Sequence, residues 1–281
     1  MPECMTPLSI KNTGGTLLPY SVPCGKCPNC YKRRVSEWSF RLMQHEKQCI
    51  SSNFITLTYD TEHIPINGQG FRTLEKKDLQ NFFKRLRKLG EHKGSPKPPK
   101  ISYYAVGEYG GRTHRPHYHI ILFNGCIDTI QRAWRLDNKD IGSVHYGVVS
   151  GASIGYCLKY MSKRCKIGVP EWDTRQRQFA LFSKGLGANY LTDAMKKWHY
   201  DDDMNRMYVN LLDGRKVSMP RYYKDKLYGT NQRKIIGEYQ RAQKELRQIS
   251  QPCTQTEAEK ASAVAAAFIR MERNDLKGRT I

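Results

Sequence analysis

The sequence lacks a membrane span, because no apolar run approaches the roughly 18 residues that a spanning helix requires. Its first segment has no basic start followed by an apolar stretch, so we expect no secretory signal peptide. The sequence shows no internal repeat that would indicate a solenoid or an array. These absences predict a cytosolic chain with no membrane partner, in a compartment where thiols stay reduced.

Acidic residues are scarce relative to basic ones. The 281 residues include 47 Lys and Arg against 26 Asp and Glu, which gives a formal net charge of +21. An excess this large indicates a polyanionic partner, and nucleic acid is the commonest one. The alternative is a basic soluble protein without such a partner. Hydrophobic residues make up 39% of the chain, so we expect most of it to fold rather than stay disordered.

Nine cysteines are present, an odd number, and three of them are crowded together at Cys24, Cys27 and Cys30. Their spacing indicates a metal site rather than disulfides. Three thiolates lack a fourth ligand, and Cys4 is the candidate that would complete a structural zinc site. The bacterial iron–sulfur pattern needs a further cysteine at the position that Arg34 occupies. Cysteines without any ligand remain the alternative.

Hydrophobic periodicity predicts alternating strands and helices in the middle of the chain. The expected strands are residues 53–59, 101–107, 117–123 and 143–149, and the expected helices are 73–90, capped by Thr73, 128–136 and 152–163. The resulting order, β-α-β-β-α-β and then a helix, is that of the ferredoxin-like split βαβ fold. We therefore expect an α+β protein with an antiparallel, ferredoxin-like or RRM-like sheet and helices on one of its faces.

The helix expected at 73–90 carries basic residues on the side opposite its apolar stripe. Surface helices normally mix charges of both signs, whereas basic residues dominate here. This pattern favours contact with DNA phosphates over a plain solvated face. The candidate residues are Lys76, Lys77, Lys84, Arg85, Arg87 and Lys88.

His117 and His119 are two residues apart on an expected strand, so their imidazoles point to the same face. Two surface histidines without a ligand are the alternative. If the preceding turn centres on residues 112–113, Glu108 lies directly across from His117. A carboxylate beside two imidazoles forms a three-ligand site with open positions, which suits Mg²⁺ or Mn²⁺. We expect His114 to lie in the turn, outside this site.

Tyr156 and Tyr160 are four residues apart on an expected helix and therefore share one face. A lysine follows each of them three residues later, at Lys159 and Lys163. A lysine ammonium favours the phenolate or the charge that builds on a phosphate. Together with a metal that polarises a phosphodiester, the pattern fits transfer of a DNA strand onto tyrosine. Two packed aromatic residues on an amphipathic helix are the alternative.

Several separated motifs resemble the replication initiators of the HUH endonuclease family, in the Rep-type order with histidines before tyrosines. Three of them, FITLTYD (54–60), HYH (117–119) and YCLKYMSK (156–163), resemble the general motifs of that family. Two more, VPCGKCPNC (22–30) and GEYGGRTHRPHYHIILF (107–123), resemble the initiators of gokushovirus-like microviruses, which are small single-stranded DNA phages. The resemblance spans about residues 22–225.

This resemblance implies a site-specific DNA endonuclease and strand transferase that acts in rolling-circle replication. Tyrosine would attack the origin strand, become linked to its 5′ phosphate and leave a 3′ hydroxyl that primes synthesis, and a later transfer would rejoin the strand. The implied partners are single-stranded or origin DNA and the host replication helicase and polymerase, in the host-cell cytoplasm. We expect three domains: a Cys-rich segment and basic helix at 1–52, the HUH endonuclease domain at 53–230 and a C-terminal helical extension at 231–281.

Two other functions remain open on the sequence alone. An RRM-like sheet with a zinc module could bind single-stranded nucleic acid without catalysis, with the tyrosines stacking on bases. Within the enzyme class, a transposase could use the same chemistry.

Overall fold

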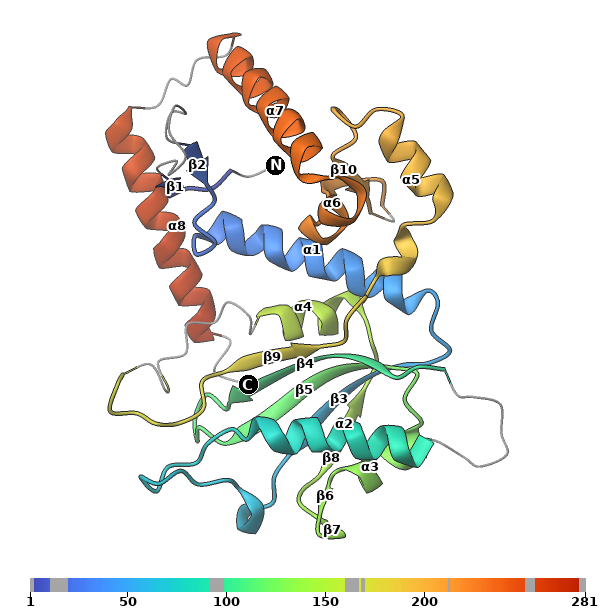
Figure 1. Ribbon diagram of the computed structural model, residues 1–281. Coiled ribbons are helices and arrows are strands. Elements are labelled where there is room, and N and C mark those ends of the chain that lie inside the picture. The colour runs from blue at the N-terminus through green and yellow to red at the C-terminus, as the bar shows by residue number, and fades with distance from the viewer. Residues whose placement is uncertain are drawn as a thin grey trace. The chain divides into compact units, whose positions relative to one another are not determined.

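A five-stranded antiparallel sheet forms the centre of one of the two compact units into which the chain divides (Figure 1). The computed structural model describes residues 3–10, 20–90, 99–159, 167, 170–211, 213–250 and 256–277. The sheet-containing unit comprises residues 42–187 with 275–281, and the other unit comprises residues 1–41 with 188–274. Each unit is described by itself below.

The sheet has the strand order β8-β3-β5-β4-β9, and every neighbouring pair is antiparallel. Its strands are β3 (Ser52–Thr58), β4 (Ser102–Tyr109), β5 (Pro116–Phe123), β8 (Val144–Gly147) and β9 (Phe179–Phe182). The central strand β5 has the near-continuous apolar sequence expected of a strand covered on both faces. Four of these strands confirm the sequence-based expectation, whereas the edge strand β9 was not expected.

One face of the sheet carries the main hydrophobic core of this unit. It is covered by α2 (Lys76–Gly90) and α3 (Ile127–Ala133). The apolar stripe of α2, formed by Leu79, Phe82, Phe83 and Leu86, packs in one cluster with Tyr118, Ile120 and Leu122 of β5. Ile130 of α3 and Trp134, which directly follows this helix, are both fully buried.

The opposite face is covered by α4 (Gly151–Lys159), as Figure 1 shows. This helix contacts β5 and buries Ile154, Cys157 and Leu158. The expectation that all helices lie on one face was therefore wrong. The cause is that β5 is apolar on both sides, so each face needs its own covering helix. Residues 160–163, the rest of the expected helix, lie outside the described residues.

The start of α2 also differs from the expectation, because Thr73 is not its cap. The helix begins at Lys76, and the Glu75 carboxylate accepts the backbone N–H of Lys77 at 2.9 Å. Thr73 instead accepts the backbone N–H of Gln176 at 2.9 Å. Thr73 thus holds the segment before β9 against this part of the sheet.

The other unit combines the N-terminal segment with most of the C-terminal half. Its elements are β1 (Leu8–Ile10), β2 (Tyr20–Val22), the first part of α1 (Pro28–Glu46), α5 (Asp193–Tyr200), β10 (Tyr208–Asn210), β11 (Lys216–Ser218), α6 (Arg221–Leu227), α7 (Thr230–Ser250) and most of α8 (Glu257–Lys277). The pairing of β10 with β11 forms an antiparallel hairpin. The hydrophobic core of this unit contains Phe40 of α1 together with Val209, Met219 and Tyr223.

The short elements complete the description. They are the two-stranded ladder β6 (Arg135–Leu136) with β7 (Lys139–Asp140) and the 3-10 turns Thr61–His63 and Ala188–Tyr190. Residues 188–230 belong to the same compact unit as residues 1–41. The endonuclease domain expected from the sequence, 53–230, included them. Among the helices that the structure describes, none has both the length and the apolar character for a membrane span.

Candidate active site

The hairpin of β4 and β5 brings an acidic residue and two histidines together. Glu108 pairs with His117 across the two strands, which confirms the register expected from the sequence. His119 follows two residues later on the same face of β5. The expected turn position of His114 is also confirmed, since its φ is +51° and its N–H bonds to the carbonyl of Gly110. It lies outside the group.

The three side chains converge on one carboxylate oxygen. Glu108 Oε1 lies 2.6 Å from His117 Nε2 and 3.0 Å from His119 Nε2. The two imidazole rings are 4.9 Å apart and almost perpendicular. Glu108 and His119 are buried and His117 is half-buried. Their ligand atoms all lie within 4.8 Å of one another, so the group can hold a metal ion.

The hydrogen bonds of His117 show that a positive charge is needed between its Nε2 atom and the Glu108 carboxylate. Its Nδ1 lies 3.1 Å from the carbonyl oxygen of Arg115, which can only accept, so Nδ1 donates. In the neutral ring Nε2 is then an acceptor, and it faces a carboxylate that is also an acceptor. A proton or a cation must lie between them. Glu108 Oε2 is buried without a hydrogen-bond partner among the described residues, which leaves it available to an ion.

The electrostatics keep Glu108 charged. Burial alone would raise the pKa of this carboxyl, but hydrogen bonds from His117 and His119 bring its pKa below the ordinary value. An ionised carboxylate inside a protein is stable only when it is paired or binds a metal. The site therefore presents one negative charge to whatever it binds.

Two residues of β3 complete the surroundings of His119, and the sequence reasoning missed both. Thr56 lies across from His119 in the β3–β5 ladder, and its hydroxyl is 2.8 Å from His119 Nδ1. Phe54 stacks on the His119 ring with a centroid separation of 5.7 Å. Both belong to the apolar strand motif at 54–60. The sequence does not show that this strand pairs with β5, and that pairing is what brings them to His119.

Tyr156 of α4 lies against the same histidine. Its ring meets the edge of His119 at 5.0 Å and that of Phe54 at 6.3 Å, and the side chain is 36% exposed. Cys157 and Leu158 are buried beneath it and fix the helix on the sheet. Lys159 ends the helix, whereas Tyr160 and Lys163 lie outside the described residues. The structure thus brings one of the two expected tyrosines to the histidine group.

The basic residues of α2 do not share this face of the sheet. Tyr118, between the two histidines, points to the opposite face and donates its hydroxyl to the Glu75 carbonyl just before α2. Arg85 donates to the backbone carbonyl of Ala133, so part of its charge serves the packing of α3. Contact of DNA with Lys76, Lys77, Lys84, Arg85, Arg87 and Lys88 stays a prediction.

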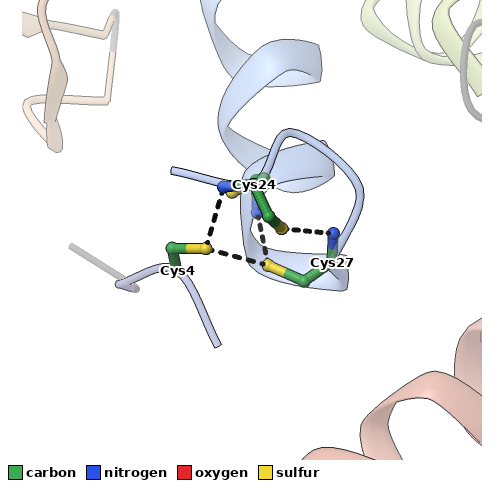
Figure 2. A group of neighbouring side chains, drawn as sticks. Cys4, Cys24 and Cys27 are labelled. Carbon is green, nitrogen blue, oxygen red and sulfur yellow. Dashed lines mark hydrogen bonds between the residues drawn. The ribbon is translucent and has the colours of Figure 1, made fainter. Parts of the chain in front are cut away.

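A second group of potential ligands lies in the other unit (Figure 2). The sulfur atoms of Cys4, Cys24, Cys27 and Cys30 all lie within 4.8 Å of one another. The sequence predicted Cys4 as the fourth member of this group, and the structure brings it there.

Comparison with known proteins agrees with the motifs. Residues 52–165 match the model of the family described as replication-associated protein ORF2/G2P. The chain is 31% identical over 205 residues to the replication-associated protein ORF2 of Spiroplasma virus 4, a match that covers 66% of this chain and 61% of that protein. It is 29% identical over 235 residues to the replication-associated protein VP4 of Bdellovibrio phage phiMH2K, covering 77% of this chain and 70% of that protein.

A further relative is the replication-associated protein ORF4 of Chlamydia phage 1, which is 25% identical over 240 residues, or 78% of this chain and 55% of that protein. The match thus spans less than two thirds of the length of the Spiroplasma and Chlamydia virus proteins. No solved structure matches the chain. Residues 52–165 thus match the replication-associated protein ORF2/G2P family, and the chain is similar to these phage replication-associated proteins.

Proposed function

We propose that the protein initiates rolling-circle replication of a phage genome in the host-cell cytoplasm, by nicking one DNA strand at the origin and later rejoining it. The proposed reaction is a transesterification in which a tyrosine oxygen bonds to a DNA phosphorus. The bond from that phosphorus to the 3′ oxygen breaks, which leaves a 5′-phosphotyrosine and a free 3′ hydroxyl. The names of the relatives support the role in replication, and the site chemistry supports the reaction.

The observation that carries this proposal is the position of Tyr156 against His119. A potential nucleophile lies beside a buried group of two imidazoles and one carboxylate, on the face that α4 only partly covers. An exposed phenol beside such a group has access to a phosphate bound there. A tyrosine that served only to pack the helix would be expected to lie among Ile154, Cys157 and Leu158, which are fully buried.

Glu108, His117 and His119 would hold the metal ion. Mixed nitrogen and oxygen ligands with open positions suit Mg²⁺ or Mn²⁺ when the substrate supplies further oxygens. Such an ion, when bound, polarises the phosphodiester. The carbonyl of Arg115 and the hydroxyl of Thr56 fix the orientation of the two rings.

The lysines that follow the tyrosines would support the nucleophile. Lys159 is three residues after Tyr156 on the same helix, a spacing that makes them neighbours on the helix surface. Its ammonium would stabilise the phenolate or the charge on phosphate in the transition state. We assign the same roles to Tyr160 and Lys163, by analogy in the sequence, so that one tyrosine holds a strand end while the other cuts again.

The fold and the charge are consistent with this function. The antiparallel sheet with the histidine pair on its central strand is the arrangement expected of an HUH endonuclease, in its ferredoxin-like form. The net charge of +21 favours binding of the phosphate backbone. The free 3′ hydroxyl would then be extended by the host polymerase, with the host replication helicase as a second partner.

The test is a search for a covalent protein–DNA adduct. The full chain is incubated with a library of single-stranded oligonucleotides from the phage origin and Mn²⁺, and the DNA-linked peptide is mapped by mass spectrometry. We expect an adduct on the peptide that contains Tyr156 and Tyr160, formed only with metal. Tight binding of the same oligonucleotides with no adduct would instead indicate a non-catalytic nucleic-acid-binding protein.

A further inference from the structure

The four-cysteine group lies where a short N-terminal segment meets the start of α1. Cys4 comes from the segment 3–10, whereas Cys24, Cys27 and Cys30 come from the turn before the helix and its first turn. The antiparallel pairing of β1 and β2 aligns Leu8 with Val22. This pairing brings the segment before β1, which carries Cys4, close to the segment after β2, which carries the other three cysteines.

The segment that carries Cys4 has little apolar packing to hold it in place. All three residues of β1 are exposed, with Leu8 54% and Ile10 40% accessible. Two polar contacts fasten its beginning: Asn29 Nδ2 donates to the Glu3 carbonyl at 2.8 Å, and the Glu3 carboxylate pairs with Lys244 of α7. Exposed contacts of this kind contribute little. A metal bond to Cys4 would hold this segment more firmly than these contacts do.

The backbone around the cysteines is arranged to stabilise thiolate anions. Cys24 Sγ accepts the N–H groups of both Lys26 and Cys27 at 3.3 Å, in a turn that Gly25 permits by its φ of +72°. Cys4 Sγ accepts the N–H of Cys24 at 3.2 Å, as Figure 2 shows. Hydrogen bonds that converge on sulfur in this way are worth most when the sulfur is charged.

The remaining two cysteines use the N-terminus of α1. Cys27 directly precedes Pro28, a residue favoured at the first helical position, and its sulfur accepts the N–H of Cys30 at 3.5 Å in the manner of a helix cap. Met5 donates its N–H to the same sulfur at 3.4 Å. The positive end of the helix dipole favours negative charge on both thiols. Cys27 and Cys30 are nevertheless buried, so charged sulfurs there need a cation.

We infer that Cys4, Cys24, Cys27 and Cys30 bind one zinc ion, which links the segment 3–10 to the start of α1. Zinc with thiolate bonds of about 2.3 Å in a tetrahedron places its sulfurs roughly 3.8 Å apart. The sulfurs of Cys4 and Cys27 are 3.8 Å apart. All four lie within 4.8 Å of one another, a spacing that suits a single ion better than a cluster with several irons.

The charge of the surroundings fits the same ion. Zinc with four thiolates carries a net charge of −2, and the adjacent sequence supplies Lys26, Lys32, Arg33 and Arg34. Arg34 also donates to the carbonyl of Gly25, which steadies the turn. The zinc would be structural, because four protein ligands leave no open position.

The first experiment measures metal in the full-length protein after dialysis against a weak chelator. We expect about one zinc per chain and no comparable iron or sulfide. Cys4→Ala should lose this zinc, whereas Cys4→His should keep it, because three cysteines and one histidine also form zinc sites. The matched control is Cys126→Ser, which removes an exposed cysteine of the other unit and should keep the metal.

Further measurements keep the inference testable if Cys4→Ala folds poorly. Cobalt-substituted wild-type protein should show the visible bands of tetrahedral thiolate coordination, and Cys4→His should change them. The double variant His117→Ala, His119→Ala should keep its zinc, so failure of the proposed nicking function does not affect this test. Zinc that persists in Cys4→Ala, iron in place of zinc, or wild-type protein without bound metal would each overturn the inference.

Discussion

Glu108 and His117 stand directly opposite each other on β4 and β5, with the carboxylate oxygen 2.6 Å from the imidazole Nε2. The Glu108 carboxylate is negatively charged and needs a cation. It lies beside Nε2 of His117, whereas Nδ1 of the same ring contacts the backbone carbonyl of Arg115. His119, two residues on, turns its own Nε2 to the same oxygen. The site therefore depends on strand register, and a shift of one residue would send both histidines to the other face of the sheet.

His117→Ala and His119→Ala should each abolish nicking while the fold is kept. Each change removes a metal ligand, so the loss should exceed the roughly 10–100-fold typical of residues that only orient ligands. The measurement is adduct formation with a single-stranded origin oligonucleotide over a Mn²⁺ titration. His114→Asn, in the neighbouring turn, is the control and should cleave normally, since asparagine tolerates the positive φ there. Normal cleavage by either alanine variant with metal still required would refute the metal site.

Thr56→Val should weaken metal binding without removing a ligand. The hydroxyl 2.8 Å from His119 Nδ1 orients the ring, and valine keeps its shape without that hydrogen bond. We expect metal affinity to fall by roughly 10–100-fold, with cleavage restored at high Mn²⁺. The control is Thr129→Val on α3, which loses a hydrogen bond to the Cys126 carbonyl but lies on the face of the sheet opposite the histidines. Equal metal titrations for both variants would show that Thr56 does not act through His119.

The hairpin and its ligands could be predicted from the sequence because they are local. Glu108 and His117 are nine residues apart, and one assumed turn position was enough to pair them. The relation of Thr56 to His119 spans 63 residues and depends on which strands become neighbours, a choice made by packing. The two-residue period of the strand motif could show which side Thr56 faces, but not which residue it meets.

The same limit explains the errors in the fold. The edge strand β9 is only four residues long and pairs solely with β4 among the described strands, so its short apolar sequence was not recognised. Thr73 has the right residue type for a helix cap, but the backbone N–H of Gln176 occupies its hydroxyl. In both cases a contact distant in the sequence decided the local structure. The cysteine group shows the converse, since its residue type and spacing pointed to a contact with Cys4.

Gly142→Ala should destabilise the sheet-containing unit. A Cβ at Gly142 would lie 1.8 Å from the carbonyl oxygen of Thr58, a backbone atom at the end of β3 that cannot move freely. Forced overpacking of this kind costs about 1–3 kcal/mol, measured as the change in unfolding free energy in denaturant. Gly155→Ala on α4 is the matched control, because nothing lies within 4 Å of its Cβ. It should raise stability by about 0.5–1 kcal/mol. Equal stability of the two variants would contradict the close approach of these segments.

The last prediction concerns the two tyrosines. The phenol ring of Tyr156 lies against His119, and Tyr160 follows four residues later in the sequence with a lysine at the same spacing. No sequence feature makes either one the sole nucleophile. We therefore expect Tyr156→Phe and Tyr160→Phe each to retain some cleavage of a simple oligonucleotide, because phenylalanine keeps the packing and removes only the oxygen.

The double variant should form no adduct, since both nucleophilic oxygens are then absent. The rate of cutting followed by strand transfer should fall in both single variants, because these two successive reactions need two tyrosines that become linked to DNA in turn. The two activities are measured separately, with a labelled oligonucleotide for cutting and a second, unlabelled strand for transfer. An adduct in the double variant would disprove the assignment of the nucleophile to these tyrosines. If one single variant lost all cutting and the other cut normally, the mechanism would use a single tyrosine, and the second one would be a packing residue.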